Sequence, residues 1–303
     1  MSFELTILGT NSALPISNRY PTAQVLEVPG RCFLIDCGEG TQIQLRRYKI
    51  NFSKLRNIFI SHLHGDHYYG LIGLLSTMNL MGIKHDIHIY AHSELKRLIE
   101  AQLDFIRGEM TITPVFHPLN LKKPQKIFDS KNIEVISFPV KHSVPTCGFL
   151  FREKPKAANI KKEMIKTYNI PIAQIKAIKA GADFIADDGT VIPNAALTIP
   201  PKKPKSYAFC TDTAFHPPIA EIIKGADVLY HESTFLEELH DLAGKTLHST
   251  ARQAAEMAKL AAAKKLIIGH YSARFKDVSK FEDEAREVFE NTEAAVEGRR
   301  YSI

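Results

Sequence analysis

The segment 61–67, which reads SHLHGDH, constrains the fold of this chain more than any other. It follows an apolar run at residues 58–60 that is typical of a buried strand. His62 and His64 are two positions apart, so they can point to the same side of an extended backbone. Gly65 has no side chain and therefore allows a sharp turn before Asp66 and His67. The segment predicts a strand that ends in a tight loop of metal-seeking side chains.

These side chains favour a metal site over a surface loop that happens to contain histidines. The alternative has some weight, because the chain has 13 histidines among 303 residues. An isolated His-x-His pair would be weak evidence, but His-x-His-x-Asp-His directly after a strand is much more specific. Imidazole with carboxylate suits zinc, manganese or iron better than calcium or magnesium. The loop offers too many donors for one tetrahedral ion, so we expect two neighbouring metals.

The composition is that of an ordinary globular protein without a membrane partner. Hydrophobic residues make up 45% of the chain and charged residues 24%, which is enough to build a full core. The N-terminus does not resemble a signal peptide, and no apolar run is long enough to span a bilayer. The four cysteines lie in apolar stretches and form no Cys-x-x-Cys pair. We therefore expect reduced core cysteines and a cytoplasmic location.

The positive charge of the chain is concentrated in one segment. Residues 152–205 hold eleven basic residues and five acidic ones, an excess that equals the formal net charge of +6 of the whole chain. A lysine-rich run is most often a solvated surface. The concentration of the entire surplus in one insert favours instead an arm that binds phosphates.

Hairpins come first in the chain, and strands then alternate with helices. Residues 23–28 and 31–35 read as strands joined by a Pro-Gly turn. The other expected strands are 3–8, 57–61, 86–91, 133–140, 147–151, 206–210, 228–230 and 266–269. The expected helices are 43–48, 71–81, 94–106, 160–168, 250–263 and a last one from residue 279. This order predicts an α/β fold in which two sheets pack face to face with helices outside.

Three helices carry capping signals in the sequence. Thr250 with Gln253 reads as a capping box, and Ser279 with Glu282 reads as another. Ser93 is an expected N-cap, and Gly298 is expected to end the last helix.

Two metals need more ligands than segment 61–67 provides. His142, Asp212 and His270 each follow an apolar strand directly. Taken singly, each is more readily a capping or structural residue than a ligand. Together they supply the missing donors, and the two oxygens of Asp212 could bind one metal each.

Several segments together resemble one family. In chain order they are 38–42 (GEGTQ), 62–67 (HLHGDH), 141–145 (KHSVP), 211–213 (TDT), 231–234 (HEST), 247–250 (LHST) and 269–275 (GHYSARF). The loop at 62–67 is similar to the signature of the metallo-β-lactamase superfamily. The full set resembles ribonuclease Z, the endonuclease that removes the 3′ trailer from precursor tRNA. The resemblance covers nearly the whole chain except the insert.

The resemblance implies a fold and a set of metal ligands. The fold is a four-layer αββα sandwich formed by a single catalytic domain over residues 1–303, with a protruding arm inserted at 152–205. Two zinc ions per subunit are implied. One is held by His62, His64 and His142, the other by Asp66, His67 and His270, with Asp212 between them.

The resemblance also implies catalytic roles. A hydroxide shared by two metals would attack the phosphodiester, since metals lower the pKa of bound water. Asp66 would orient the water, and His248 would protonate the leaving oxygen while Glu232 fixes its tautomer. The implied products are a tRNA 3′-hydroxyl and a trailer with a 5′-phosphate.

The family's arm grips tRNA, often through a Gly-Pro motif, and its members are homodimers. The corresponding stretch here, 170–181, keeps lysines but has no Gly-Pro pair. The RNA-binding residues that we expect in this arm are Lys161, Lys162, Lys176 and Lys179. Precursor tRNA and a second copy of the chain are thus the expected partners.

Two other functions remain open. A hydrolase of small esters, lactones or cyclic nucleotides would share the metal loop but would have little need of the basic insert. A metal-binding or RNA-binding protein without turnover would not need Glu232 and His248 beside seven ligands.

Overall fold

The computed structural model describes residues 3–303, apart from the side chains of residues 105–107. Two mixed sheets of seven strands each form its centre. The first has the order β18-β1-β2-β3-β4-β5-β6, in which β3 to β6 are parallel and β1 pairs antiparallel with β2 and β18. Its strands are β1 (Glu4–Gly9), β2 (Ala23–Val28), β3 (Arg31–Ile35), β4 (Leu55–Phe59), β5 (Asp86–Ala91), β6 (Thr113–Pro118) and β18 (Arg300–Ser302).

The second sheet has the order β17-β16-β15-β14-β9-β8-β7, and its strands β14 to β17 are parallel. Its strands are β7 (Gln125–Asp129), β8 (Ile133–Pro139), β9 (Cys147–Glu153), β14 (Ser206–Cys210), β15 (Val228–Glu232), β16 (Leu266–Gly269) and β17 (Thr292–Ala294).

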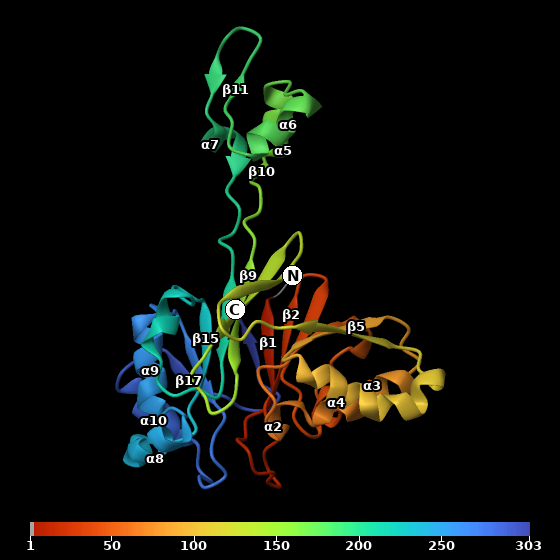
Figure 1. Ribbon diagram of the computed structural model, residues 1–303. Helices are drawn as coiled ribbons and strands as arrows, with labels where there is room; N and C mark the ends of the chain where they lie inside the picture. Colours follow the sequence, from red (N-terminus) through yellow and green to blue (C-terminus); the bar gives the residue numbers. More distant parts are fainter. Residues whose placement is uncertain (1–2) are drawn as a thin grey trace. The chain divides into compact units, whose positions relative to one another are not determined.

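Helices cover the outer face of each sheet. In Figure 1, α3 and α4 lie on one side of the two sheets, and α9 and α10 lie on the other. The α-helices of this part of the chain are α1 (Thr41–Arg47), α2 (Gly65–Tyr68), α3 (Gly70–Leu80), α4 (Glu94–Leu103), α8 (His240–Thr246), α9 (Ala251–Leu260) and α10 (Ser279–Arg286). The 3-10 helices are η1 (Phe52–Lys54), η2 (Asp104–Glu109), η3 (Pro217–Glu221) and η4 (Glu237–Leu239). The predicted four-layer αββα sandwich is confirmed.

Aromatic side chains fill the space between the two sheets. Phe59 of β4 contacts Phe149 and Phe151 of β9, with ring centroids 5.6 Å and 5.3 Å apart. The neighbours Ile58 and Ile60 point to the opposite face and join the core beneath the helices. Both faces of β4 are thus buried, so the strand before segment 61–67 is held firmly and fixes where that segment begins.

Ser93 is the N-cap residue of α4, as expected, but its side chain makes no capping bond; Nδ1 of His92 accepts the N–H of Glu94 at 3.2 Å instead. Two other expected helix signals are wrong. Asp277 takes the place of Ser279 at the last helix, since its Oδ1 accepts from the N–H of Ser279 at 2.9 Å. That helix ends at residue 286 and not at Gly298, which lies between β17 and β18. The capping box of Thr250 and Gln253 is confirmed.

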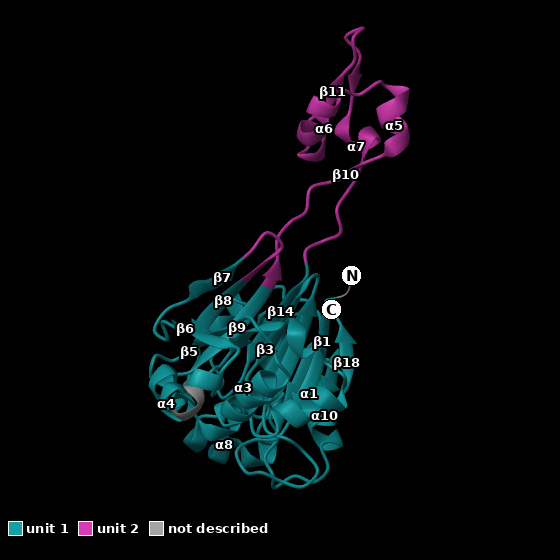
Figure 2. Cartoon of the chain, turned by 90° about the vertical axis from the view of Figure 1, so that its right-hand side faces the viewer, with its two compact units in different colours: residues 1–129, 135–151, 205–303 teal, residues 130–134, 152–204 magenta. Residues whose placement is uncertain are grey.

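Residues 130–134 and 152–204 form a second compact unit, drawn in magenta in Figure 2. It has its own small core of Ile170, Ile178, Phe184, Ile192 and Leu197. Its elements are β10 (Asn159–Ile160), α5 (Lys162–Thr167), α6 (Ile172–Lys179), β11 (Phe184–Ile185), β12 (Val191–Ile192), α7 (Asn194–Leu197) and β13 (Thr198–Ile199).

Candidate metal centre and active site

The candidate site lies where several strands of both sheets end. Strands β14 and β16 deliver Asp212 and His270 just past their carboxyl ends, and parallel strands present these ends at one edge. The loop after β4 and the short helix α2 contribute the 61–67 segment. Ligand atoms lie within 4.8 Å of one another in three groups: His62, His64, His142 and Asp212; Asp66, His67 and His270; Asp212, His248 and His270. All seven predicted ligands are therefore brought together; that they hold metal stays a prediction.

The carboxylate of Asp212 lies between two pairs of histidines. Its Oδ2 is 3.5 Å from Nε2 of His62 and 3.7 Å from Nε2 of His142. Its Oδ1 is 3.1 Å from Nε2 of His67 and 3.2 Å from Nε2 of His270. Each oxygen thus faces one pair of imidazoles, an arrangement in which one carboxylate could serve two cations.

Oxygen acceptors hold the far side of three of the site imidazoles. Nδ1 of His67 donates to Asp36 at 2.7 Å, and Nδ1 of His142 donates to the carbonyl of Leu247 at 3.1 Å. Nδ1 of His270 lies 3.0 Å from the hydroxyl of Thr234. A proton on Nδ1 leaves the lone pair on Nε2, so these bonds orient the lone pairs toward Asp212.

Unsatisfied nitrogens indicate that the donor set fits a cation. Nε2 of His62, His67 and His270 is buried in each case and has no hydrogen-bond partner. A buried polar atom without a partner is costly, and native structures seldom keep one without a reason. Three such nitrogens around one carboxylate match the donors that zinc binds.

The backbone is strained at this site. Asp36, Asp212, Leu247 and His270 have φ values of 56°, 46°, 58° and 63°, in the left-handed region. Such conformations cost about 1–3 kcal/mol for residues other than glycine and are common at functional sites. This backbone conformation directs the side chains of Asp212 and His270 toward the other donors.

Charges in the site favour a cation. Burial alone would raise the pKa of Asp212, but His270, His67 and His62 outweigh it and hold that pKa well below its ordinary value. Burial lowers the pKa of His67, but Asp212, Asp66 and Asp36 together raise it well above its ordinary value. The carboxylates thus create a negative potential that a divalent metal would neutralise better than a proton.

The predicted acid pair is tightly connected. Nδ1 of His248 lies 2.7 Å from Oε1 of the buried Glu232. Burial lowers the pKa of His248, but Glu232 outweighs this and raises it to about 9. Burial raises the pKa of Glu232, but the charge of His248 outweighs this and lowers it to about 2. The pair therefore combines a carboxylate with a protonated imidazole at neutral pH.

A cleft of about 550 Å³ opens onto these groups. It is lined by Asp66, Asp212, His248 and His270 among others. Oδ2 of Asp66 accepts the N–H of Ala13 at 2.8 Å and lies 3.4 Å from Nε2 of His67. The loop after β1 thereby holds Asp66 at the floor of the cleft.

Sequence reasoning missed the residues that support the ligands. Asp36 accepts from Ser61 as well as from His67, and Thr234 links Glu232 to His270. The available signal was their position, because Asp36 follows β3 directly and Thr234 lies two residues after β15. Arg19 had no predicted role; its guanidinium donates to the carbonyl of Phe275 at 2.9 Å.

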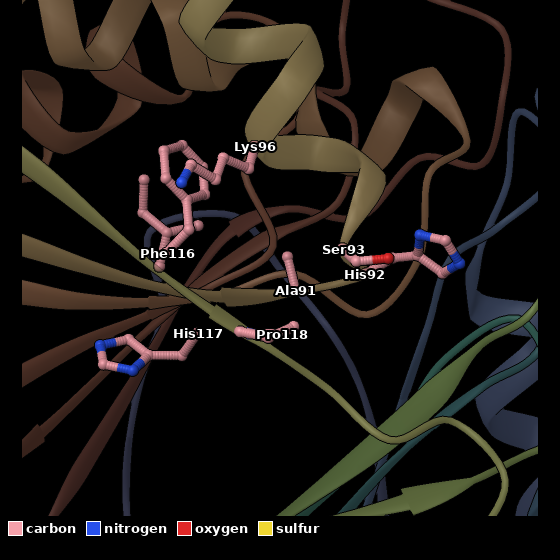
Figure 3. A pocket seen from close by; sticks show the side chains of 8 residues that line it. Ala91, His92, Ser93, Lys96, Phe116, His117 and Pro118 are labelled. Atoms are coloured by element: carbon pink, nitrogen blue, oxygen red, sulfur yellow. The ribbon is translucent and has the colours of Figure 1, made fainter.

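Another pocket lies away from the predicted ligands. It has a volume of about 230 Å³ and lies between α4 and strand β6 (Figure 3). Lys96 and Phe116 both line it, whereas the ring of His117 points away from α4. His117 stacks on Tyr90 with ring centroids 4.4 Å apart. The lining of this pocket includes none of the seven predicted ligands.

The predicted RNA-binding lysines all lie in the second unit. Lys162 begins α5, and Lys176 and Lys179 lie in the last turn of α6. Lys162 and Lys176 are exposed and Lys179 is half-buried. Nζ of Lys161 donates to the carbonyl of Ala196 at 2.9 Å, so it also connects two parts of this unit.

Comparisons with known proteins give the same class as the geometry. The model of the "Beta-lactamase superfamily domain" matches residues 163–271, and that of "Anti-Pycsar protein Apyc1" matches residues 3–160. Human tRNase Z, short form, superimposes with a TM-score of 0.72 at 26% identity, covering 99% of each chain. Yeast long-form RNase Z has a TM-score of 0.69 at 18% identity and shares the fold over 42% of its length.

The fold and this donor set define a member of the metallo-β-lactamase superfamily. Full-length relatives identify the branch. The ribonuclease Z of Phocaeicola vulgatus is 45% identical over 99% of this chain and 97% of its own length. That of Porphyromonas gingivalis is 42% identical over 100% of this chain and 99% of its own length. The chain belongs to the ribonuclease Z family. Within residues 3–303, no helix combines the length and apolar character that a membrane crossing requires.

Proposed function

We propose that this chain is a zinc-dependent endoribonuclease that removes the 3′ trailer from precursor tRNA. The observation that carries the proposal is the position of Asp212 between two histidine pairs, with His248 at the same cleft and Glu232 buried behind it. Relatives named ribonuclease Z over the full length supply the substrate class. The products are a tRNA with a 3′-hydroxyl and a trailer with a 5′-phosphate.

Seven residues would hold two zinc ions per chain. One set is His62, His64 and His142, the other is Asp66, His67 and His270, and Asp212 serves both. When bound, the metals would lower the pKa of a water so that it loses its proton at neutral pH. They would also place positive charge close to the phosphate.

Asp66 orients the attacking water and accepts its proton. Its Oδ2 is engaged by the N–H of Ala13 and faces Nε2 of His67 and of His270, at 3.4 Å and 3.6 Å. Oδ1 of the same carboxylate is then the acceptor that the water reaches. Charge at His67 keeps the pKa of Asp66 low against the effect of burial, so the carboxylate is ionised at neutral pH.

His248 acts as the general acid at the leaving oxygen. Its Nδ1 is bonded to Glu232, so the proton on Nε2 is the one available to substrate. A 3′-oxygen that leaves without a proton is a strong base, and proton donation is typically worth about 10²–10⁴ in rate. Glu232 cannot rotate away, because the N–H groups of Thr213 and Thr234 both donate to it.

The second unit binds tRNA through its lysines. Lys162 and Lys176 lie exposed on two helices, and the segment 152–205 carries the whole formal charge excess. Contacts between lysines and phosphates give affinity without reading sequence, which suits recognition of tRNA by shape. We propose that a homodimer is the working form and that it acts in the cytoplasm, in line with four free, buried cysteines.

One assay distinguishes this function from its rivals. A tRNA with a 3′ trailer is incubated with the protein, with and without a chelator, beside a small phosphodiester and a small ester. Chelator-sensitive cleavage directly after the discriminator base supports the proposal. Hydrolysis of the small esters alone would indicate a small-molecule hydrolase, and binding without cleavage would indicate a binding protein.

A further inference from the structure

A second, smaller pocket continues the metal-site cleft on the side of His248. Its volume is about 220 Å³, and it shares Ser12, Ala13 and His248 with the larger cleft. Its other walls are largely apolar and include Leu14, Phe235 and Leu242, with Arg274 among the lining residues. None of these last four residues has a role in the metal centre or in proton transfer.

The proposed reaction fixes which part of the substrate lies near this pocket. His248 protonates the 3′-oxygen that leaves phosphorus, and that oxygen belongs to the last nucleotide that the tRNA keeps. The nucleoside attached to it must therefore lie beside His248, on the leaving-group side of the phosphate. This step rests on the proposed function.

We propose that this pocket binds the base of the last nucleotide retained by the tRNA. The ring of Phe235 lies 6.3 Å from the ring of His248 at an angle of 70°, so a base against Phe235 stays next to the acid. Leu14 is 67% exposed on the loop that also supplies the N–H of Ala13 to Asp66. An exposed leucine facing an apolar pocket gains a partner when a flat, uncharged ring enters.

Arg274 completes the chemistry expected for a nucleobase. It is exposed, and a guanidinium can stack on a base or pair with a neighbouring phosphate. Apolar stacking accepts every base, because each has a π-face, so the pocket selects for a base without choosing among the four. A base held there would fix the scissile phosphate at the metals and thereby the cleavage position.

The test couples removal of the base with a change in the pocket. Precursor tRNA is prepared with the normal last retained nucleotide or with an abasic nucleotide at that position. Cleavage of both is measured as kcat/KM for the wild type and for Leu14→Ala and Phe235→Leu. Leu80→Ala is the matched control, since Leu80 is an apolar side chain that is 87% exposed on α3.

The expected penalty for the abasic substrate is about tenfold in the wild type and in Leu80→Ala, the order of one stacked base. In Leu14→Ala and Phe235→Leu the penalty falls to about threefold or less, because base and pocket no longer interact. Independent effects on kcat/KM multiply. A change in folding alone would therefore lower kcat/KM for both substrates by the same factor and leave the penalty unchanged. A penalty equal in all four proteins would overturn the pocket assignment while leaving the proposed function intact. A wild type that leaves the normal precursor uncut would refute the proposed function, and this inference with it.

Discussion

Nδ1 of His248 lies 2.7 Å from Oε1 of Glu232, and that carboxylate also accepts the N–H of Thr213 at 2.9 Å. Its other oxygen accepts from the N–H and the hydroxyl of Thr234 at 3.0 Å and 2.7 Å. Glu232 is fully buried, whereas His248 lines the cleft. A fixed carboxylate behind an accessible imidazole is the arrangement expected of a general acid.

Replacement of His248 tests this role. His248→Ala should lower kcat for precursor tRNA by about 10²–10⁴, because the leaving oxygen is no longer protonated. A precursor with sulfur in place of that 3′-oxygen needs no acid, since a thiolate is a much weaker base, with a thiol pKa of about 8.5. On this substrate the variant should approach the wild-type rate in single-turnover measurements. An equally large defect on the sulfur substrate would exclude His248 as the acid.

The pH dependence of kcat should reveal the His248–Glu232 pair. The pKa of His248 is raised to about 9, because Glu232 outweighs the effect of burial. The protonated form is the active acid, so kcat should fall as pH rises through about 9. In Glu232→Gln the carboxylate charge is lost, the pKa falls below its wild-type value, and the alkaline limb moves to lower pH.

Glu237→Gln is the control for the pH experiment. It changes a Glu–His pair on the surface, in which Nδ1 of His240 lies 3.1 Å from Glu237. Its alkaline limb should coincide with that of the wild type. If kcat fell at the same alkaline pH in the wild type, Glu232→Gln and Glu237→Gln, the assignment of this fall to His248 would be contradicted.

Asp36 should control metal affinity without touching metal. It accepts from Nδ1 of His67 at 2.7 Å and from the hydroxyl of Ser61 at 2.9 Å. Asp36→Asn should weaken zinc binding by about 10–100-fold, the usual effect of losing such a supporting acceptor. Competition with a chromogenic chelator measures this. Asp227→Asn, at a carboxylate that accepts from Ser206, is the control; equal affinities in both variants would refute the role.

The lysines of the second unit should determine the salt dependence of RNA cleavage. Replacing Lys162, Lys166 and Lys176 by Gln should raise KM for precursor tRNA more than for a small phosphodiester. The slope of log KM against log salt should become shallower by roughly 0.7–0.9 for each phosphate that the protein no longer neutralises. Gln at Lys122 and Lys123, exposed lysines outside this unit, is the matched control. If the triple variant had the same slope as the wild type, the lysines of this unit would not bind tRNA.

The sequence predicted the strands that carry strong apolar patterns. The bounds of β2, β3, β5, β14 and β16 agree with the expected ones, because these strands are buried between two layers. Strand β6 was missed because two prolines interrupt it, which an edge position tolerates. Strands β17 and β18 were missed because three residues are too few to show a period.

The predicted ligands come together because each follows a strand end, a position visible in the sequence. The supporting residues were not predictable in the same way. Asp36 reaches His67 across 31 positions, through the parallel pairing of β3 with β4. The donor to Asp66 is the backbone N–H of Ala13, a contact that no side-chain pattern encodes.

The most direct test of the account is a zinc titration with product mapping. Metal-free protein receives zinc in steps, and cleavage of a precursor tRNA is followed while the new RNA ends are identified. We predict that activity rises until two zinc ions are bound per chain, with a tRNA 3′-hydroxyl and a trailer 5′-phosphate as products. Full activity without zinc or with one ion, or a trailer that begins with a 5′-hydroxyl, would contradict it.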